Sequence, residues 1–79
     1  MGTEPRLLVA DDDADIRELV TFKLRQAGYE VVAVADGSAA LAEARANPPA
    51  LAVLDVMMPG LSGLDVLRDL KADEATQDV

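Results

Sequence analysis

The sequence predicts an α/β fold in which three strands and three helices alternate as βαβαβα around a parallel sheet. Three short apolar runs are each followed by a segment whose apolar residues recur every three or four positions, as on one face of a helix. Two of these runs lead directly into aspartates. Alternation of strand and helix implies right-handed crossovers, which make the strands parallel and place helices on both faces of the sheet.

The first half of the chain predicts a strand, a helix and a second strand. Residues Arg6–Ala10 are an apolar run that leads into three successive aspartates. The helix begins near Ala14 and ends before Gly28, because glycine readily adopts the left-handed conformation that terminates helices. Residues 29–35 are rich in β-branched side chains and predict the second strand. The helix face expected to point inward consists of Ile16, Leu19, Val20, Leu24 and Ala27.

A second helix is expected from Ser38 to Ala46, with Asp36 or Ser38 as its N-cap. Leu41 and Ala44 are its expected inward residues. The Asn-Pro-Pro sequence that follows ends the helix, because proline disfavours helix in the residue before it and has no N–H to donate.

The third apolar run, Ala50–Leu54, contains no polar residue, so we expect a strand that is buried on both faces. A third helix is expected over residues 63–72. Residues 1–5 are expected to be a disordered leader, residues 6–72 the folded domain, and residues 73–79 a polar tail without a recognisable element. The apolar set of the third helix is Leu64, Val66, Leu67 and Leu70.

Composition limits the chain to one small domain. Its 79 residues are 51% hydrophobic, and a domain of this size buries only about 60 to 65% of the surface of its unfolded chain. It contains no cysteine, which excludes disulfides and thiolate metal sites and fits the cytoplasm. No apolar run reaches the roughly 20 residues of a membrane span. A net charge of −8 favours cations or basic partners, so we expect no nucleic acid bound by this chain and no membrane contact.

Asp55 follows the third strand at the place where an open parallel sheet meets its ligands. A lone buried carboxylate costs several kcal/mol, so this acid needs a partner, a solvent opening or a function. If the first and third strands are neighbours, about 5 Å apart, Asp55 faces Asp11 and Asp12 across an acidic crevice. Three such carboxylates repel one another and favour a cation, and oxygen ligands suit Mg²⁺. A carboxylate nucleophile beside Mg²⁺ is an arrangement suited to phosphoryl transfer to aspartate.

Other roles stay open for these acids. Asp55 could cap the following turn, as aspartate often does at the first position of a type I turn. Asp11, Asp12 and Asp13 could instead stabilise a helix start through its dipole, by about 0.3 to 1 kcal/mol each. Asp11 could be the nucleophile of an aspartyl-phosphate phosphatase, although Asp55 would then go unexplained. A calcium loop is excluded, because isoleucine and phenylalanine occupy the positions of its glycine and its bidentate glutamate.

Three sequence blocks together resemble the receiver domain of two-component response regulators, and their details resemble the winged-helix (OmpR/PhoB-like) class most. The blocks are Leu7–Asp13, Ala35–Leu41 and Val53–Gly63, and they span nearly the whole chain in the expected order. The resemblance implies a flavodoxin-like (CheY-like) parallel sheet, of which this chain would form the part with strand order 2-1-3.

The resemblance also implies roles for individual residues. Asp55 matches the phosphoacceptor, which takes a phosphoryl group from a sensor histidine kinase. Asp12 matches a direct Mg²⁺ ligand, Asp11 a ligand that acts through water, and Met57 the residue whose backbone carbonyl completes the metal site. The residues that match the loop after the phosphoacceptor are Pro59 and Gly63. An ordinary loop role explains the proline equally well.

The resemblance stops after the third helix. Receiver domains continue for two more strands and helices, which carry a Ser or Thr that senses the phosphoryl group and a Lys that pairs with it. Lys23, Lys71 and Thr76 do not match those positions. We therefore expect a truncated receiver domain with impaired switching, which can at most dephosphorylate itself and is not a dedicated enzyme.

The third strand would then lie at the edge of the sheet although its sequence is typical of a central strand. Exposed apolar edges tend to pair with other chains. We therefore expect a homodimer or swapped assembly through this edge, or support from a fused or partner chain. The alternative function is a non-catalytic fragment that acts as a structural, dimerisation or fusion module.

Overall fold

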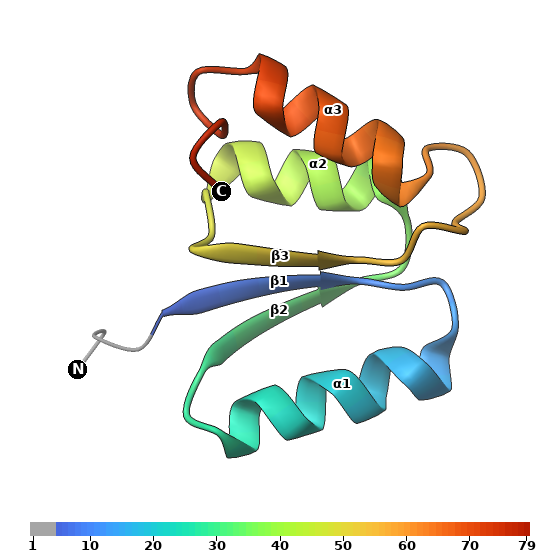
Figure 1. The fold of residues 1–79 in the computed structure, drawn as a ribbon. Helices are drawn as coiled ribbons and strands as arrows, with labels where there is room; N and C mark the ends of the chain where they lie inside the picture. The colour runs from blue at the N-terminus through green and yellow to red at the C-terminus, as the bar shows by residue number, and fades with distance from the viewer. Residues whose placement is uncertain (1–4) are drawn as a thin grey trace.

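The computed structural model describes residues 5–79, and its six elements follow the predicted βαβαβα order (Figure 1). The expected leader, residues 1–5, lies outside the described residues except for Pro5. The elements are β1 (Arg6–Ala10), α1 (Ala14–Gln26), β2 (Glu30–Val34), α2 (Gly37–Ala46), β3 (Leu51–Leu54) and α3 (Gly63–Ala72).

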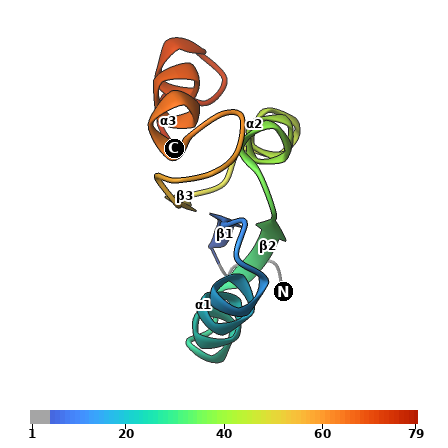
Figure 2. The ribbon, with the colours of Figure 1, turned by 90° about the vertical axis from the view of Figure 1, so that its right-hand side faces the viewer.

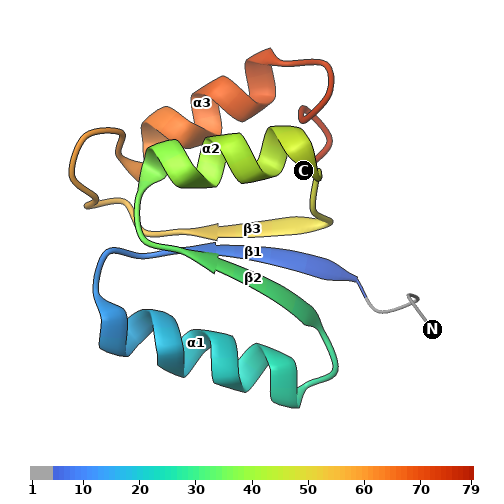
Figure 3. The ribbon, with the colours of Figure 1, turned by 180° about the vertical axis from the view of Figure 1, so that it is seen from behind.

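The three strands form a parallel sheet in the order β2-β1-β3, which confirms the predicted order. Helix α1 lies on one face of the sheet, whereas α2 and α3 lie on the other (Figure 2). All three strands point toward the same edge of the sheet, where the helices begin, as the view from behind also shows (Figure 3). This edge carries the loops that follow β1 and β3.

Each helix begins at a side chain that accepts hydrogen bonds from its first turn. The Asp13 carboxylate accepts from two backbone N–H groups of α1, and the Asp36 carboxylate caps α2. Ser62 and Asp65 form a reciprocal capping box at α3, in which each side chain accepts from the other residue's backbone N–H. Gly28 has a φ of 101°, so the predicted left-handed glycine does follow α1.

The main core lies between the sheet and the pair α2 and α3. From α3, Val66 and Leu70 enter this core, whereas Leu64 and Leu67 point outward. On the other side of the sheet, α1 covers β1 and β2 only (Figure 2). The buried residues of the main core are Leu8, Ala10, Ala40, Leu41, Ala44, Met58, Val66 and Leu70.

Two expectations about burial are wrong. Ile16 and Leu19 are exposed, and Thr21 is buried instead, because α1 turns the side of Thr21 toward β1 and β2. Leu51 and Val53 of β3 are also exposed, because no helix among the described residues covers that side of the strand (Figure 2).

Residues 73–79 contain no helix or strand, but they fold back in turns against α3. The hydroxyl of Thr76 is buried and donates to the carbonyl of Leu70 at 2.8 Å. The Lys71 ammonium donates to the carbonyls of Gln77 and Val79. The polar tail therefore closes the end of α3. From Pro5 to Val79, no helix is both long and apolar enough to cross a membrane.

Candidate functional site

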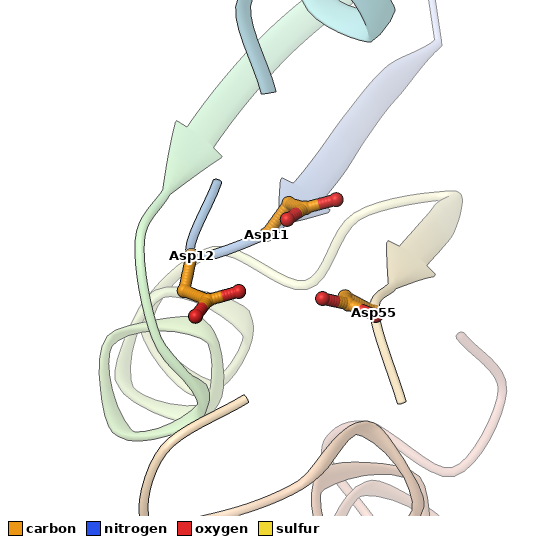
Figure 4. Close-up of side chains that lie close together, drawn as sticks. All are labelled: Asp11, Asp12 and Asp55. Atoms are coloured by element: carbon orange, nitrogen blue, oxygen red, sulfur yellow. The ribbon is translucent and has the colours of Figure 1, made fainter. Parts of the chain in front are cut away.

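The structure brings Asp11, Asp12 and Asp55 together at the carboxyl edge of the sheet. Because β1 and β3 pair in register, with Ala10 opposite Leu54, the residues that follow these strands are neighbours. One oxygen from each carboxylate lies within 4.8 Å of the others. The carboxylates of Asp12 and Asp55 point toward one another, and that of Asp11 lies to one side of them (Figure 4).

Asp55 is positioned by bonds to the strand before it and to the loop after it. Its backbone N–H donates to the carbonyl of Ala10 at 2.9 Å, which fixes it beside β1. Its carboxylate accepts from the backbone N–H of Met57 at 3.2 Å. The turn-capping role is therefore present, and it uses only one of the two carboxylate oxygens.

The acids after β1 divide into two kinds. Asp13 uses one carboxylate oxygen to cap α1, at 2.9 Å from the N–H of Asp15 and 3.1 Å from that of Ile16. Asp11 accepts from the N–H of Asp13, and its backbone carbonyl accepts from the guanidinium of Arg17 at 2.8 Å. The helix-start interpretation thus holds for Asp13, whereas Asp11 and Asp12 belong to the acidic cluster.

The donor set fits Mg²⁺. Three carboxylates supply hard oxygen ligands, and in an octahedral site with bonds of about 2.1 Å opposite oxygens lie about 4.2 Å apart. The oxygens of the cluster lie within 4.8 Å of one another, so the carboxylates would have to move closer together by about 0.6 Å or more to bind one ion directly. Mutual repulsion among three carboxylates is relieved by such a cation. Asp15, in the first turn of α1, does not belong to this cluster, which among the described residues consists of Asp11, Asp12 and Asp55.

Two glycines hold the loop after β3 in place: Gly63, which the sequence assigned to the loop after the phosphoacceptor, and Gly37, which the sequence did not connect with the acids. A Cβ added to Gly63 would overlap the carbonyl group of Asp55, so only glycine lets α3 begin this close to the acid. A Cβ on Gly37 would overlap Leu61 in the same loop. Pro59 lies exposed in this loop, where Gly60 has a φ of 75°.

Sequence reasoning also missed the capping box that starts α3. A serine three residues before an acidic residue, as in Ser62 and Asp65, is a known signal of a helix start and could have been found. The contact between Gly37 and Leu61 had no such signal, because it joins the first residue of α2 to a loop that is distant in sequence.

The two lysines of the chain, Lys23 and Lys71, lie on α1 and α3. Among the described residues, neither lysine belongs to the acidic cluster or bonds to it. Lys71 is bonded to carbonyls of the tail, and Thr76 is buried against α3. Neither residue takes the place of the lysine or the hydroxyl that the resemblance implies.

Comparison with known proteins gives the same family over nearly the whole chain. The model of the response regulator receiver domain matches residues 7–79. The DNA-binding response regulator MtrA of Mycobacterium tuberculosis is 46% identical over 68 residues, which are 86% of this chain and 30% of that protein. The alkaline phosphatase synthesis transcriptional regulatory protein PhoP of Bacillus subtilis is 41% identical over 66 residues, which are 84% of this chain and 28% of that protein. The chain therefore spans less than a third of these regulators.

Solved structures show the same fold. The N-terminal domain of a response regulator receiver protein from Methanoculleus marisnigri superposes with a TM-score of 0.90 at 33% identity, covering 95% of this chain and 61% of that one. The response regulator TrrA of Thermotoga maritima, solved with Mg²⁺-BeF, gives a TM-score of 0.85 at 37% identity, covering 89% of this chain and 61% of that one. The predicted flavodoxin-like (CheY-like) architecture is thus confirmed, and the chain belongs to the receiver-domain family of response regulators.

Proposed function

We propose that this chain is a phosphoacceptor, which receives a phosphoryl group on Asp55 from the phosphohistidine of a sensor histidine kinase. One observation carries the proposal: the carboxylate of Asp55 meets those of Asp11 and Asp12 at the carboxyl edge of the sheet. In the reaction a carboxylate oxygen of Asp55 forms the new O–P bond while the N–P bond of the donor breaks. The leaving imidazole nitrogen keeps the electron pair.

Mg²⁺ is the proposed cofactor, and when bound it neutralises charge on the phosphoryl oxygens. We assign Asp12 and Asp55 as direct ligands, Asp11 as a ligand through water, and the backbone carbonyl of Met57 as the remaining protein ligand. The N–H of Met57 already holds one oxygen of Asp55, which orients the carboxylate. Gly63 allows α3 to begin against the carbonyl of Asp55 and so fixes the backbone that carries the acid.

The chain supplies an acceptor, and the reaction that forms the donor belongs to the kinase. We therefore propose a phosphoryl acceptor in the cytoplasm that is not a dedicated enzyme. Its net charge of −8 opposes direct contact with nucleic acid, so DNA binding would belong to another part of a longer protein or to another chain.

The test is the intact mass of the chain after incubation with acetyl phosphate and Mg²⁺. We expect one hydroxylamine-labile phosphoryl group on the parent and none on Asp55→Asn. Asp11→Asn should retain the adduct at a reduced rate, and Asp69→Asn on α3 is the matched control that leaves it unchanged. An adduct that survives in Asp55→Asn but is lost in Asp11→Asn would instead indicate the phosphatase-type nucleophile.

Metal binding is tested by thermal melting with and without Mg²⁺. A hundredfold excess of Mg²⁺ over its dissociation constant should stabilise the folded chain by about 2.7 kcal/mol. Asp12→Asn should remove most of this gain, whereas Asp69→Asn should keep it. A folded chain that gains nothing from Mg²⁺ and accepts no phosphoryl group would favour the structural module.

We also propose self-association through the edge of β3, the last strand of the sheet that the described residues form, as a homodimer or a swapped assembly. The supporting observation is the exposure of Leu51 and Val53 on a strand whose other side packs against the main core. Light scattering at tens of micromolar tests this proposal, and a single monomeric species with a cooperative melt would contradict it.

A further inference from the structure

Arg17 of α1 is bonded to the backbone of the loop that carries the acids. Its guanidinium donates to the carbonyl oxygen of Asp11 at 2.8 Å, and the arginine is half-buried. Asp11 is the first residue after β1 and belongs to the acidic cluster. Both partners of the bond lie in the segment from β1 to α1, so the bond does not depend on what lies beside β3.

The bond acts on the peptide group that joins Asp11 to Asp12. A peptide group is planar, so its carbonyl and the N–H of the next residue turn as one unit. A donor that holds the carbonyl of Asp11 therefore also fixes the backbone of Asp12, and with it the direction in which that side chain leaves the chain. Figure 4 shows the carboxylate of Asp12 directed toward that of Asp55.

The side chain of Asp12 depends on its backbone for this direction. Its neighbours are held by their own side chains, because Asp11 accepts from the N–H of Asp13 and Asp13 caps α1. Within residues 5–79, the exposed carboxylate of Asp12 takes part in none of the side-chain hydrogen bonds or ion pairs. The peptide group that Arg17 holds is therefore a main control on where this carboxylate points.

Arg17 is not paired with a carboxylate. In the part of the chain that the structure describes, the ion pairs join Arg45 to Asp73 and Arg68 to Asp65. A guanidinium that only balanced the charge of the acids would be expected against one of their carboxylates. This one donates to a backbone carbonyl instead, which suits a role in fixing the loop.

We propose that Arg17 is a positioning residue of the metal site, which directs the Asp12 carboxylate toward the Mg²⁺ that Asp12 shares with Asp55. This proposal deepens the proposed function and rests on its metal site. Groups that orient the ligands of a metal typically change its affinity by about 10- to 100-fold when they are removed.

Electrostatics alone predicts the opposite effect. A guanidinium close to the acids repels Mg²⁺, so removing only its charge should strengthen Mg²⁺ binding. Loss of the bond to Asp11 should weaken Mg²⁺ binding, because Asp12 is then free to turn away from Asp55. The sign of the change in affinity therefore distinguishes positioning from charge.

Arg25 provides a matched control on the same helix. Its guanidinium donates to the carbonyl of Val31 at 3.0 Å, again across six residues of sequence and in a part-buried place. Val31 lies in β2 and carries no acid of the cluster. Arg17→Gln and Arg25→Gln thus remove the same charge and the same kind of bond from α1, and only Arg17→Gln releases the acidic loop.

The test is isothermal titration calorimetry with Mg²⁺ at constant ionic strength, on variants that circular dichroism shows to be folded. Arg17→Gln should weaken Mg²⁺ binding about tenfold or more, whereas Arg25→Gln should bind as the parent does. Arg17→Lys keeps the charge and a donor without the planar guanidinium, so it should lose less affinity. If Arg17→Gln does not fold, Arg17→Lys is compared with Arg25→Lys in the same way.

A measurement without metal checks the cause. In ¹H–¹⁵N spectra recorded without Mg²⁺, Arg17→Gln should shift the amide signal of Asp12, and Arg25→Gln should shift that of Val32. Each of these N–H groups shares a planar peptide group with the carbonyl that has lost its donor.

The possible failures can be told apart. Unchanged or tighter Mg²⁺ binding by Arg17→Gln, or an Asp12 amide signal that does not move, would overturn the positioning role and leave the proposed metal site in place. Equal losses of affinity in Arg17→Gln and Arg25→Gln would also overturn it, and would assign the effect to general anchoring of α1. A parent chain that binds no Mg²⁺ would remove the proposed metal site, and the role of Arg17 with it.

Discussion

Leu7 and Leu51 are paired on adjacent strands and point to the same face of the sheet, yet Leu7 is 4% exposed and Leu51 is 53% exposed. The two leucines are register partners, but Leu7 lies on the central strand and Leu51 on an edge strand, and different layers lie over them. Helix α1 covers β1, whereas no described helix covers this side of β3. Burial in this sheet is therefore decided by the helical layer, and the apolar sequence of a strand only permits it.

The opposite face of the sheet shows the other outcome. There α2 and α3 together cover all three strands, and Leu8 lies in a closed core with Val66 and Leu70. Ala52 and Leu54 of β3 pack against the same core. The face covered by α2 and α3 therefore holds the buried core that stabilises the fold, whereas the α1 face leaves apolar side chains of β3 exposed.

The largest expected effect comes from shortening one leucine on each face. Leu8→Ala should lower the free energy of unfolding by roughly 2 to 5 kcal/mol, because it leaves a cavity in the closed core. Leu51→Ala should cost no more than about 1 kcal/mol, because half of its side chain already contacts water. Urea unfolding followed by circular dichroism, at low micromolar concentration where a dimer dissociates, measures both values.

If Leu8→Ala and Leu51→Ala lower the free energy of unfolding equally, the proposed difference between the two faces of the sheet is wrong. Leu67→Ala on the outer side of α3 is a suitable control, since this leucine is partly exposed and lies outside the closed core. Its loss in free energy of unfolding should be about as small as that of Leu51→Ala.

The order and type of the six elements could be predicted from the sequence, because each apolar run is short and each helix has its own start and stop signals. The exposed side of β3 could not be predicted, since a run without polar residues looks the same whether or not a helix covers it. The orientation of α1 was also missed. The apolar residues of this helix spread over a wide part of its circumference, so the periodicity does not indicate that Thr21 lies against the sheet.

The second prediction concerns the loop that links the closed face to the acids. Gly63→Ala should cost roughly 1 to 3 kcal/mol, because the new Cβ would overlap the carbonyl group of Asp55. It should also weaken Mg²⁺ binding, since the backbone of the acid must move. Gly60→Ala is the matched control: its φ of 75° makes alanine strained by about 1 to 2 kcal/mol, but open space surrounds it.

Mg²⁺ titrations monitored by thermal melting separate the two glycine variants. If Gly60→Ala lowers the Mg²⁺ affinity as much as Gly63→Ala does, general loosening of the loop would explain both. A loss confined to Gly63→Ala would show that close approach of α3 positions Asp55.

The acids of the site could be predicted because parallel strands bring their carboxyl ends to one edge, and Asp11, Asp12 and Asp55 do meet there. The different roles of the three aspartates that follow β1 could not be predicted. Asp11, Asp12 and Asp13 have identical side chains, and only the backbone conformation decides that Asp13 caps α1, that Asp12 faces Asp55 and that Asp11 lies beside them.

The third prediction tests the start of α3, on which the closed face depends. Ser62→Ala removes the hydroxyl that accepts from the N–H of Asp65 at 3.2 Å. It should lower the free energy of unfolding by about 1 kcal/mol, the usual value of such a cap. Ser38→Ala on α2 is the control and should have almost no effect, because Asp36 provides the cap of that helix. Similar losses in the two variants would show that the capping box contributes nothing specific.

The smallest expected effect is a change in the pH dependence of stability. The backbone N–H of Ser62 and then its hydroxyl hold the pKa of Asp65 below its usual value of 3.8, and Arg68 adds to this shift. Because the folded state lowers this pKa, the contribution of the carboxylate is complete above pH 3.8 and is lost as the pH falls through the lower value of the folded chain. Asp65→Asn should therefore be less stable than the parent near pH 7, and the difference should shrink in acid. Urea unfolding between these limits measures it, and a difference that stays constant with pH would assign the effect of Asn to helix capping and not to charge.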